Sequence, residues 1–244
     1  MAEAVSASAV PVRPAATVMI VDDRPDFQVL LLRRRAASAF VPGMDVFPGG
    51  GVDSDDSAAE AEMDGDLDDR VASARLGLAS GGLAYWRTAV RETTEEAGLV
   101  LAIGALRYAA RWITPPGPPR RYDTRFFVAA LPPGQAAVAD QIEAVQADWV
   151  APAQALADFR AGVRAMLPPT AGMLRILASY PSAAALLRAA ARAELGPDER
   201  VRLASDGGGA WSVLLPGESL GDARPGARIQ ELEAWVRLSV WRED

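Results

Sequence analysis

The chain has 244 residues, half of them apolar, which is enough for one large domain with a sizeable hydrophobic core. It contains no cysteine and no histidine, so disulfides and thiolate metal sites are excluded and a general base must be a carboxylate or a metal-bound hydroxide. The net charge of −7 argues against nonspecific binding to nucleic acid, and an anionic substrate would need arginine or a cation to offset the repulsion.

The N-terminus and the overall hydropathy indicate a cytoplasmic protein. No segment approaches the roughly 18 consecutive apolar residues that cross a bilayer. The opening MAEAVSASAVPVRP has an early acid and no compact apolar run, unlike a secretory signal. We expect residues 1–13 to be flexible and residues 14–244 to form a single domain.

The first half of the chain is expected to begin with a hairpin. Residues 16–21 (ATVMIV) and 27–35 (FQVLLLRRR) read as strands around the turn DDRPD. The stretch FVPGMDVFPGGGVDSDD, residues 40–56, is rich in Gly and Pro and is predicted to be a loop whose backbone approaches another group closely. The weakly periodic, Ala- and Asp-rich segment that follows indicates an insertion with some helix at about 54–82.

The second half alternates strands and helices. Apolar positions from Ala84 to Ala97 predict a helix of about four turns that ends at Gly98. Strands are expected at 106–114, 122–131, 144–151 and 210–217, a helix near 152–162, and a helical extension at about 168–200 whose apolar positions serve the core or a homodimer face. This order predicts an α/β (α+β) sandwich with a mixed sheet rather than a doubly wound parallel sheet.

Three carboxylates stand out in AVRETTEEAGLVL, residues 89–101. Residues three and four apart share a helical face, so Glu92, Glu95 and Glu96 are expected to project in one direction. One interpretation is a solvated acidic face. The other is a set of hard oxygen ligands for Mg²⁺ or Mn²⁺.

The glutamates stand in a longer pattern that favours the metal interpretation. FPGGGV followed by RETTEEAGL resembles the signature of the Nudix hydrolase family: Gly, five residues, Glu, seven residues, then Arg-Glu-aliphatic-x-Glu-Glu-x-Gly-aliphatic. Only Thr93 departs in the second half. The resemblance implies a Nudix-type α/β/α sandwich that binds Mg²⁺ or Mn²⁺ through Glu92, Glu95 and Glu96.

The first half of the signature is interrupted. Gly50 and Arg91 lie 41 positions apart rather than fourteen, so roughly 27 residues are inserted. Counted back from Arg91, the first glutamate of the family pattern falls on Leu83. Its substitutes would have to come from among Asp53, Asp55, Asp56 and Glu60.

The interruption resembles a branch of the family, that of the mammalian peroxisomal nucleoside-diphosphate-linked hydrolase 19. Similar stretches include MDVFPGGGVDSDD and RWITPPGPPRRYDTRFFVAALP. Members of that branch act on coenzyme A and its acyl esters, giving 3′,5′-ADP and (acyl-)4′-phosphopantetheine. The alternatives are a Nudix hydrolase of nucleotide sugars, dinucleotides or oxidised nucleotides, and a non-catalytic Nudix-fold module that binds a small molecule.

The resemblance also suggests residues for the reaction. Glu92, Glu95 and Glu96 would serve catalysis, and Glu143, before a Trp-bearing strand, is a candidate base or ligand. Gly49 and Gly50 would leave room near the metal. Arg35 matches part of a coenzyme A signature that precedes FPGG. Arg120, Arg121 and Arg125 are candidates for contacts to phosphates such as the 3′-phosphate of coenzyme A, and Tyr122 or Trp112 for stacking on the adenine. Arg121, Asp123 and Arg125 share one side of the strand and would alternatively form an ion-pair ladder.

Overall fold

The computed structural model describes residues 10–37, 42–58, 67–114, 120–192, 202–205 and 211–214. The first strand, β1 (Val12–Asp22), begins inside the N-terminal segment that we expected to be flexible. Residues 1–9 of that segment lie outside the described part. No helix among the described residues is long and apolar enough to cross a membrane.

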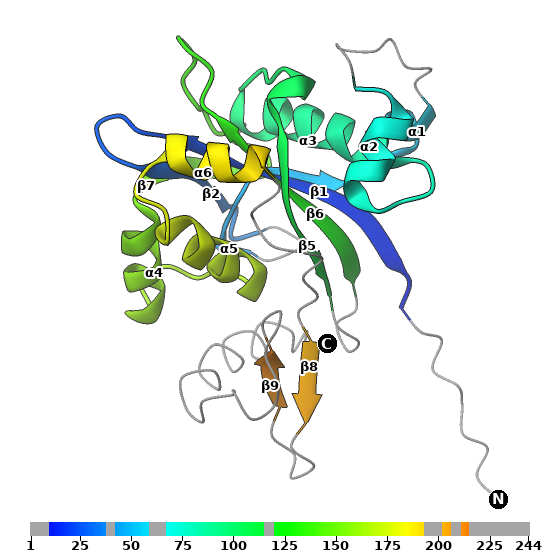
Figure 1. Ribbon diagram of the computed structural model, residues 1–244. Helices are drawn as coiled ribbons and strands as arrows, with labels where there is room; N and C mark the ends of the chain where they lie inside the picture. Colours follow the sequence, from blue (N-terminus) through cyan, green and yellow to red (C-terminus); the bar gives the residue numbers. More distant parts are fainter. Residues whose placement is uncertain are drawn as a thin grey trace, which may run out of the picture.

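The centre of the molecule is a mixed sheet built on β1 (Figure 1). Strand β1 pairs in parallel with β6 (Arg121–Ala130) and antiparallel with β2 (Gln28–Arg34) and β4 (Gly49–Gly51). The sheet order is β3-β2-β1-β6-β5, with β3 at Asp45–Val46 and β5 at Arg107–Ile113, while β7 (Ala144–Val150) pairs with β2. Residues 40–56, expected to be a loop, thus contribute two short strands, since their backbone groups pair with β2 and β1.

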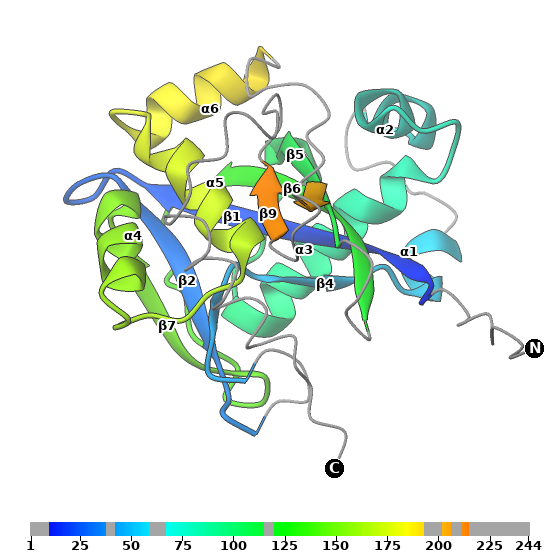
Figure 2. The same cartoon turned by 90° about the horizontal axis from the view of Figure 1, so that it is seen from below.

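Helices cover both faces of this sheet, which confirms the α/β/α sandwich (Figures 1 and 2). Side chains alternate along a strand, so β6 gives Phe126 and Val128 to one face and Phe127 and Ala129 to the other. The first face packs against α4 (Pro152–Arg160), α5 (Pro168–Ala178) and α6 (Ala183–Ala191). The second packs against α2 (Asp69–Leu76), α3 (Gly82–Ala97) and the short 3-10 helix η1 (Ile103–Ala105).

Helix α3 ends as predicted. Gly98 has φ 66°, a left-handed conformation that suits glycine, and its N–H returns to the last turn of the helix. Trp86 and Ala89 are fully buried against the sheet. Thr93, the departure from the family pattern, is also fully buried, and its hydroxyl donates to the Ala89 carbonyl oxygen at 2.7 Å. A threonine is tolerated there because its polar atom is satisfied within the helix.

The insertion contributes two helices before α3. Helix α1 covers Ser54–Ala58, and residues 59–66, which include Glu60, lie outside the described part. Helix α2 is joined to the start of α3 by Asp69, whose carboxylate accepts from the N–H groups of Gly81 and Leu83, each at 2.9 Å. Because α2 packs directly on α3, the insertion is part of the α3 layer.

The helical extension expected at about 168–200 forms two helices, α5 and α6, over its described residues 168–192, and residues 193–200 lie outside the described part. Pro181 ends the first, since it lacks an N–H and disfavours helical backbone at the residue before it. Ser182 then caps α6 by accepting from the Ala185 N–H at 3.1 Å. The apolar side chains of both helices, Leu174 and Leu186 among them, are buried in the core. The described part ends with an antiparallel pair, β8 (Arg202–Ser205) and β9 (Trp211–Leu214), the second within the strand predicted at 210–217.

Candidate active site

The C-terminal half of α3 lies over the glycine strand β4. Glu96 is 4% exposed and accepts from the Gly49 N–H at 3.0 Å. A Cβ on Gly50 would lie 2.3 Å from Oε1 of Glu92, so any larger residue at this position would force the Glu92 carboxylate to move. The close approach expected of the FPGGG segment is therefore an approach to the two glutamates on α3.

Both of these glutamates are held in a partly desolvated environment. Burial raises the pKa of Glu96 to about 8, against the opposing effects of the Gly49 N–H and of Arg34. Burial also raises the pKa of Glu92, against Arg91, and the negative charges of Glu95 and Glu143 add to that rise. Carboxylates gathered in this way repel one another, and a cation between them would reverse both shifts.

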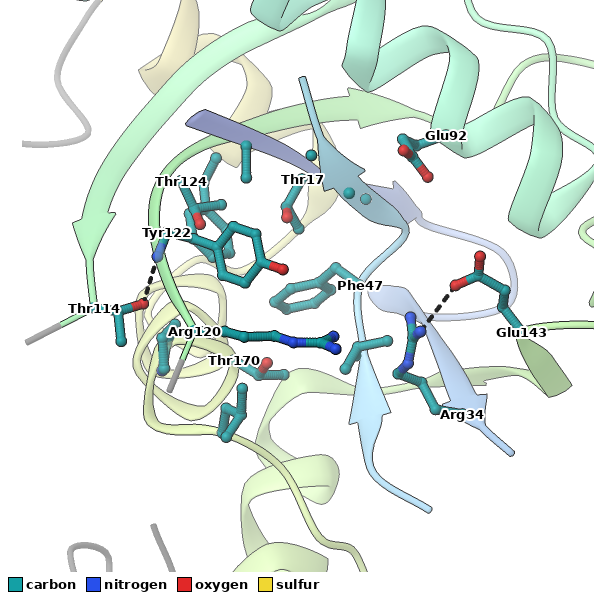
Figure 3. Close-up of a pocket in the computed structure, with 18 residues that line it drawn as sticks. Thr17, Arg34, Phe47, Glu92, Thr114, Arg120, Tyr122, Thr124, Glu143 and Thr170 are labelled. Carbon is teal, nitrogen blue, oxygen red and sulfur yellow. Dashed lines mark hydrogen bonds and ion pairs between the residues drawn. The ribbon is translucent and has the colours of Figure 1, made fainter. Parts of the chain in front are cut away.

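Arg34 on β2 links helix α3 to the loop before β7. Its guanidinium lies 3.4 Å from Oε1 of Glu96 and 2.8 Å from Oε2 of Glu143 (Figure 3). Glu143 is 56% exposed at its side chain, so it faces solvent across from the buried Glu96. The structure thus brings Glu92, Glu96 and Glu143 to one place from two distant segments.

Glu95 is the more exposed member of the predicted ligand set. Its side chain is 56% exposed and accepts at 3.0 Å from the same Nη1 of Arg91 that donates to Glu92 at 2.9 Å. Glu96 bonds instead to the Gly49 N–H and to Arg34, since adjacent helical residues differ by about 100° in direction. The joint role of Glu92, Glu95 and Glu96 as metal ligands stays a prediction. In the described part of the chain, no three acidic side chains form a ready-made cluster that could hold a metal ion.

Arg91 is held by a carboxylate from α1, the first helix of the insertion. Asp56 of α1 is 6% exposed and accepts from Nε and Nη2 of Arg91 at 3.1 and 2.8 Å. Arg91 also donates to Glu92 at 2.9 Å. Leu83, where the backward count places the first glutamate of the family pattern, is buried in the core. A forward count would have found Asp56, since it follows Gly50 after five residues.

A pocket of about 340 Å³ opens beside these carboxylates (Figure 3). Glu92, Glu143 and Arg34 line one part of it, together with the three glycines of β4. Apolar and hydroxyl-bearing side chains line the rest, along with one more arginine. These are Thr17, Phe47, Thr114, Arg120, Tyr122, Thr124, Phe126, Leu167, Pro169 and Thr170.

Of the arginines predicted to contact substrate phosphates, Arg120 lines this pocket, whereas Arg121 and Arg125 lie outside it. Strand β6 gives its even-numbered residues, Tyr122 among them, to the pocket, and its odd-numbered residues to the opposite face. Arg121 therefore donates to backbone carbonyl oxygens of Thr114 and Val10, at 3.0 and 3.4 Å. Arg125 is 1% exposed and packs over the Tyr85 ring, 5.7 Å from its centre.

The structure also places Arg35, the predicted Asp123–Arg125 ion pair and the two aromatic residues predicted to stack on a nucleobase. Arg35 is exposed and donates to the backbone oxygen of Gln141 at 3.3 Å, away from the pocket. Asp123 pairs with Arg111 through two bonds of 2.7 and 2.6 Å, more closely than with Arg125 at 4.0 Å. Trp112 is buried against Met173, which leaves Tyr122 as the aromatic residue of the predicted pair that reaches the pocket.

Comparisons of the sequence and of the overall fold with known proteins point to Nudix hydrolases. No family model matches the chain. It is 25% identical to the acyl-coenzyme A diphosphatase NUDT19 of Xenopus laevis, over 59% of this chain and 57% of that protein. The chain thus spans little more than half the length of this relative. It also resembles the crystal structure of a Nudix hydrolase from Alicyclobacillus acidocaldarius, with a TM-score of 0.60 and 25% identity over 78% of this chain and 100% of that one. In fold, signature helix and sequence, the chain resembles the Nudix hydrolases, NUDT19 among them.

Proposed function

We propose that this protein is a divalent-metal-dependent pyrophosphohydrolase of nucleoside diphosphates linked to another group, with coenzyme A or an acyl-coenzyme A as its leading substrate. The observation that carries the proposal is the convergence of Glu92 and Glu96 on the glycine strand at one end of a pocket. The likeness to an acyl-coenzyme A diphosphatase supports the choice of substrate.

The acidic side chains fit a divalent cation by their chemistry. Carboxylate oxygens are the ligands that Mg²⁺ and Mn²⁺ prefer. Glu92 and Glu96 are buried without a neutralising partner strong enough to prevent the rise of their pKa. They would hold the ion, with Glu95 or Glu143 completing the set. When bound, the metal would neutralise diphosphate oxygens and lower the pKa of a water molecule.

The residues of the chain would divide the remaining work. The side-chain-free strand at Gly49–Gly51 leaves space for diphosphate oxygens beside the glutamates. Glu143, exposed and held by Arg34 at 2.8 Å, would accept the proton of the attacking water. Arg91 would orient Glu92 and Glu95, to which it donates at 2.9 and 3.0 Å. Tyr122 offers a ring on which a nucleobase would stack.

Two other functions use the same pocket. The first is hydrolysis of nucleotide sugars, dinucleotides or oxidised nucleotides by the same carboxylates. The second is a ligand-binding module without turnover, which Leu83 at the position of the first glutamate of the family pattern favours and which Glu92, Glu95 and Glu96 oppose. We further propose that the protein acts in the cytoplasm on a small molecule. A homodimer would have to use a surface other than the buried apolar faces of α5 and α6.

The test is product analysis with a panel of coenzyme A, acetyl-coenzyme A, ADP-ribose, NADH and 8-oxo-dGTP, each with Mg²⁺, Mn²⁺ or EDTA. The proposal expects 3′,5′-ADP and the matching phosphopantetheine from the coenzyme A substrates, with no product in EDTA. Cleavage of another compound alone would retain the metal-dependent hydrolase and refute the coenzyme A assignment. Binding of ligand without turnover under either metal would favour the non-catalytic module.

A further inference from the structure

The pocket has a cationic side that the reaction proposed above does not use. In Figure 3 the Arg120 side chain points into the pocket near Tyr122 and Phe47, while Glu92 lies at the other side of the view. Arg120 comes directly before β6, so its place is fixed by the strand that forms one wall of the pocket. An arginine on this wall and carboxylates on the other give the pocket two regions of opposite charge.

The charge of Arg120 is available to a ligand. The other arginine of the pocket, Arg34, is bonded to Glu96 and Glu143. Arg120 makes no hydrogen bond or ion pair with any residue in the described ranges. The labelled side chains on the Arg120 side of Figure 3, Thr114, Tyr122, Thr124 and Thr170, bear hydroxyls rather than carboxylates. An anion would therefore meet a guanidinium and neutral hydroxyl groups on this side of the pocket, while the acids of the pocket, Glu92 and Glu143, lie on the other.

We propose that Arg120 is a specificity-determining residue that binds a second anionic group of the substrate, a phosphate monoester carried by the nucleoside. This inference rests on the proposed function, which places the diphosphate at the glutamates. A single diphosphate at the carboxylate side leaves Arg120 without a partner. A substrate with a separate phosphate monoester satisfies both regions of the pocket, because a guanidinium binds a phosphate through two parallel hydrogen bonds.

The neighbouring arginine supplies a matched control. Arg121 is adjacent in sequence and carries the same charge, but it faces away from the pocket and bonds to backbone oxygens. A general effect of lost positive charge on anionic substrates would appear in Arg121→Gln as well as in Arg120→Gln. An effect of a direct contact would appear in Arg120→Gln alone.

The kinetic test compares coenzyme A with 3′-dephospho-coenzyme A, which differ only in the phosphate monoester. With Mg²⁺, Arg120→Gln is expected to lower kcat/KM for coenzyme A about 10- to 100-fold and to leave that for the dephosphorylated compound within about twofold. Arg121→Gln is expected to preserve the ratio between the two compounds. Equal losses on both substrates in Arg120→Gln, or an unchanged ratio, would overturn the proposal.

A binding test separates this inference from the proposed reaction. Calorimetric titration in EDTA compares 3′,5′-ADP with 5′-AMP on the wild type and both variants. The wild type and Arg121→Gln should bind 3′,5′-ADP at least about tenfold more tightly than 5′-AMP, and Arg120→Gln should lose that preference. If the wild type cleaves no substrate but shows this pattern, the reaction fails and the anion contact stands. If the wild type shows no preference for 3′,5′-ADP, the contact is refuted whatever the reaction.

Discussion

Replacing Asp56 by asparagine tests the contact that joins the two halves of the interrupted signature. The Asp56 carboxylate accepts from Arg91 at 2.8 and 3.1 Å, from the Thr88 hydroxyl at 2.8 Å and from the Asp53 N–H at 3.0 Å. Asparagine keeps the shape and removes the charge. Arg91 would then remain beside Glu92 and Glu95 without the partner that fixes its position.

The expected loss of stability follows from the burial of the pair. Removing one partner of a fully buried ion pair costs about 3–5 kcal/mol. Arg91 is 27% exposed at its side chain and keeps three other carboxylates, those of Asp53, Glu92 and Glu95, so solvent and these neighbours reduce the loss. We expect about 2–3 kcal/mol, which corresponds to a drop of about 4–12 °C in the unfolding midpoint of a domain of this size.

The effect should depend on pH in a defined direction. Burial alone would raise the pKa of Asp56, but the hydrogen bonds from Arg91, Asp53 and Thr88 outweigh it and the pKa is lowered. A carboxyl group whose pKa is lowered by folding stabilises the protein above its usual pKa and loses that contribution as the pH falls through the lowered value. The difference between wild type and Asp56→Asn should be complete at pH 7 and shrink toward pH 3.

Thermal unfolding followed by circular dichroism measures this prediction, with Asp55→Asn as the control. Asp55 is the preceding residue on α1 and is exposed, so its replacement should change the free energy of unfolding by no more than about 0.5 kcal/mol. The reasoning would be refuted if Asp56→Asn and Asp55→Asn unfolded within a degree of one another at pH 7.

Three further substitutions probe the packing around the site. Gly50→Ala places a Cβ 2.3 Å from Oε1 of Glu92 and should displace that carboxylate. Because small displacements of reacting groups have large effects on rate, kcat on the cleaved substrate should fall by about 100-fold. An unchanged kcat in this variant would contradict the prediction. Gly82→Ala places a Cβ 2.4 Å from the Ser73 nitrogen and should lower the free energy of unfolding, measured in guanidinium, by about 1–3 kcal/mol. Gly104→Ala serves as its control, because a Cβ there would have no atom within 4 Å. Asp69→Ala removes the carboxylate that accepts from the Gly81 and Leu83 N–H groups and should cost about 1 kcal/mol by the same assay; an unchanged midpoint would show that these bonds contribute no stability.

The features that could be predicted from the sequence are those set by neighbouring residues along the chain. The helix that ends at Gly98 follows from its apolar spacing and its glycine, and both are visible in the chain. The close approach of the FPGGG segment follows from three adjacent glycines. Neither required knowledge of tertiary contacts.

The orientation of the arginines and the partner of Arg91 could not be predicted in this way. The phase of strand β6 decides that Tyr122 faces the pocket and Arg121 does not, and a one-residue shift reverses every assignment. Asp56 lies on the first helix of the insertion, 35 positions before Arg91, so its role depends on packing between α1 and α3. The pairing of Glu92 with Glu95 likewise depends on Arg91, which donates to both and is held from outside the helix.

The measurement that tests the central claim most directly is the rate at which coenzyme A is converted to 3′,5′-ADP and 4′-phosphopantetheine by the wild type and by Glu96→Gln. Glutamine retains an acceptor for the Gly49 N–H but removes the buried charge, and matching unfolding midpoints would establish that the variant is folded. With Mg²⁺ the wild type should release both products, Glu96→Gln should be slower by at least about 100-fold, and EDTA should abolish release. Equal rates in the two proteins, or release that EDTA leaves unchanged, would contradict the assignment of this glutamate pocket as the site of a metal-dependent hydrolysis.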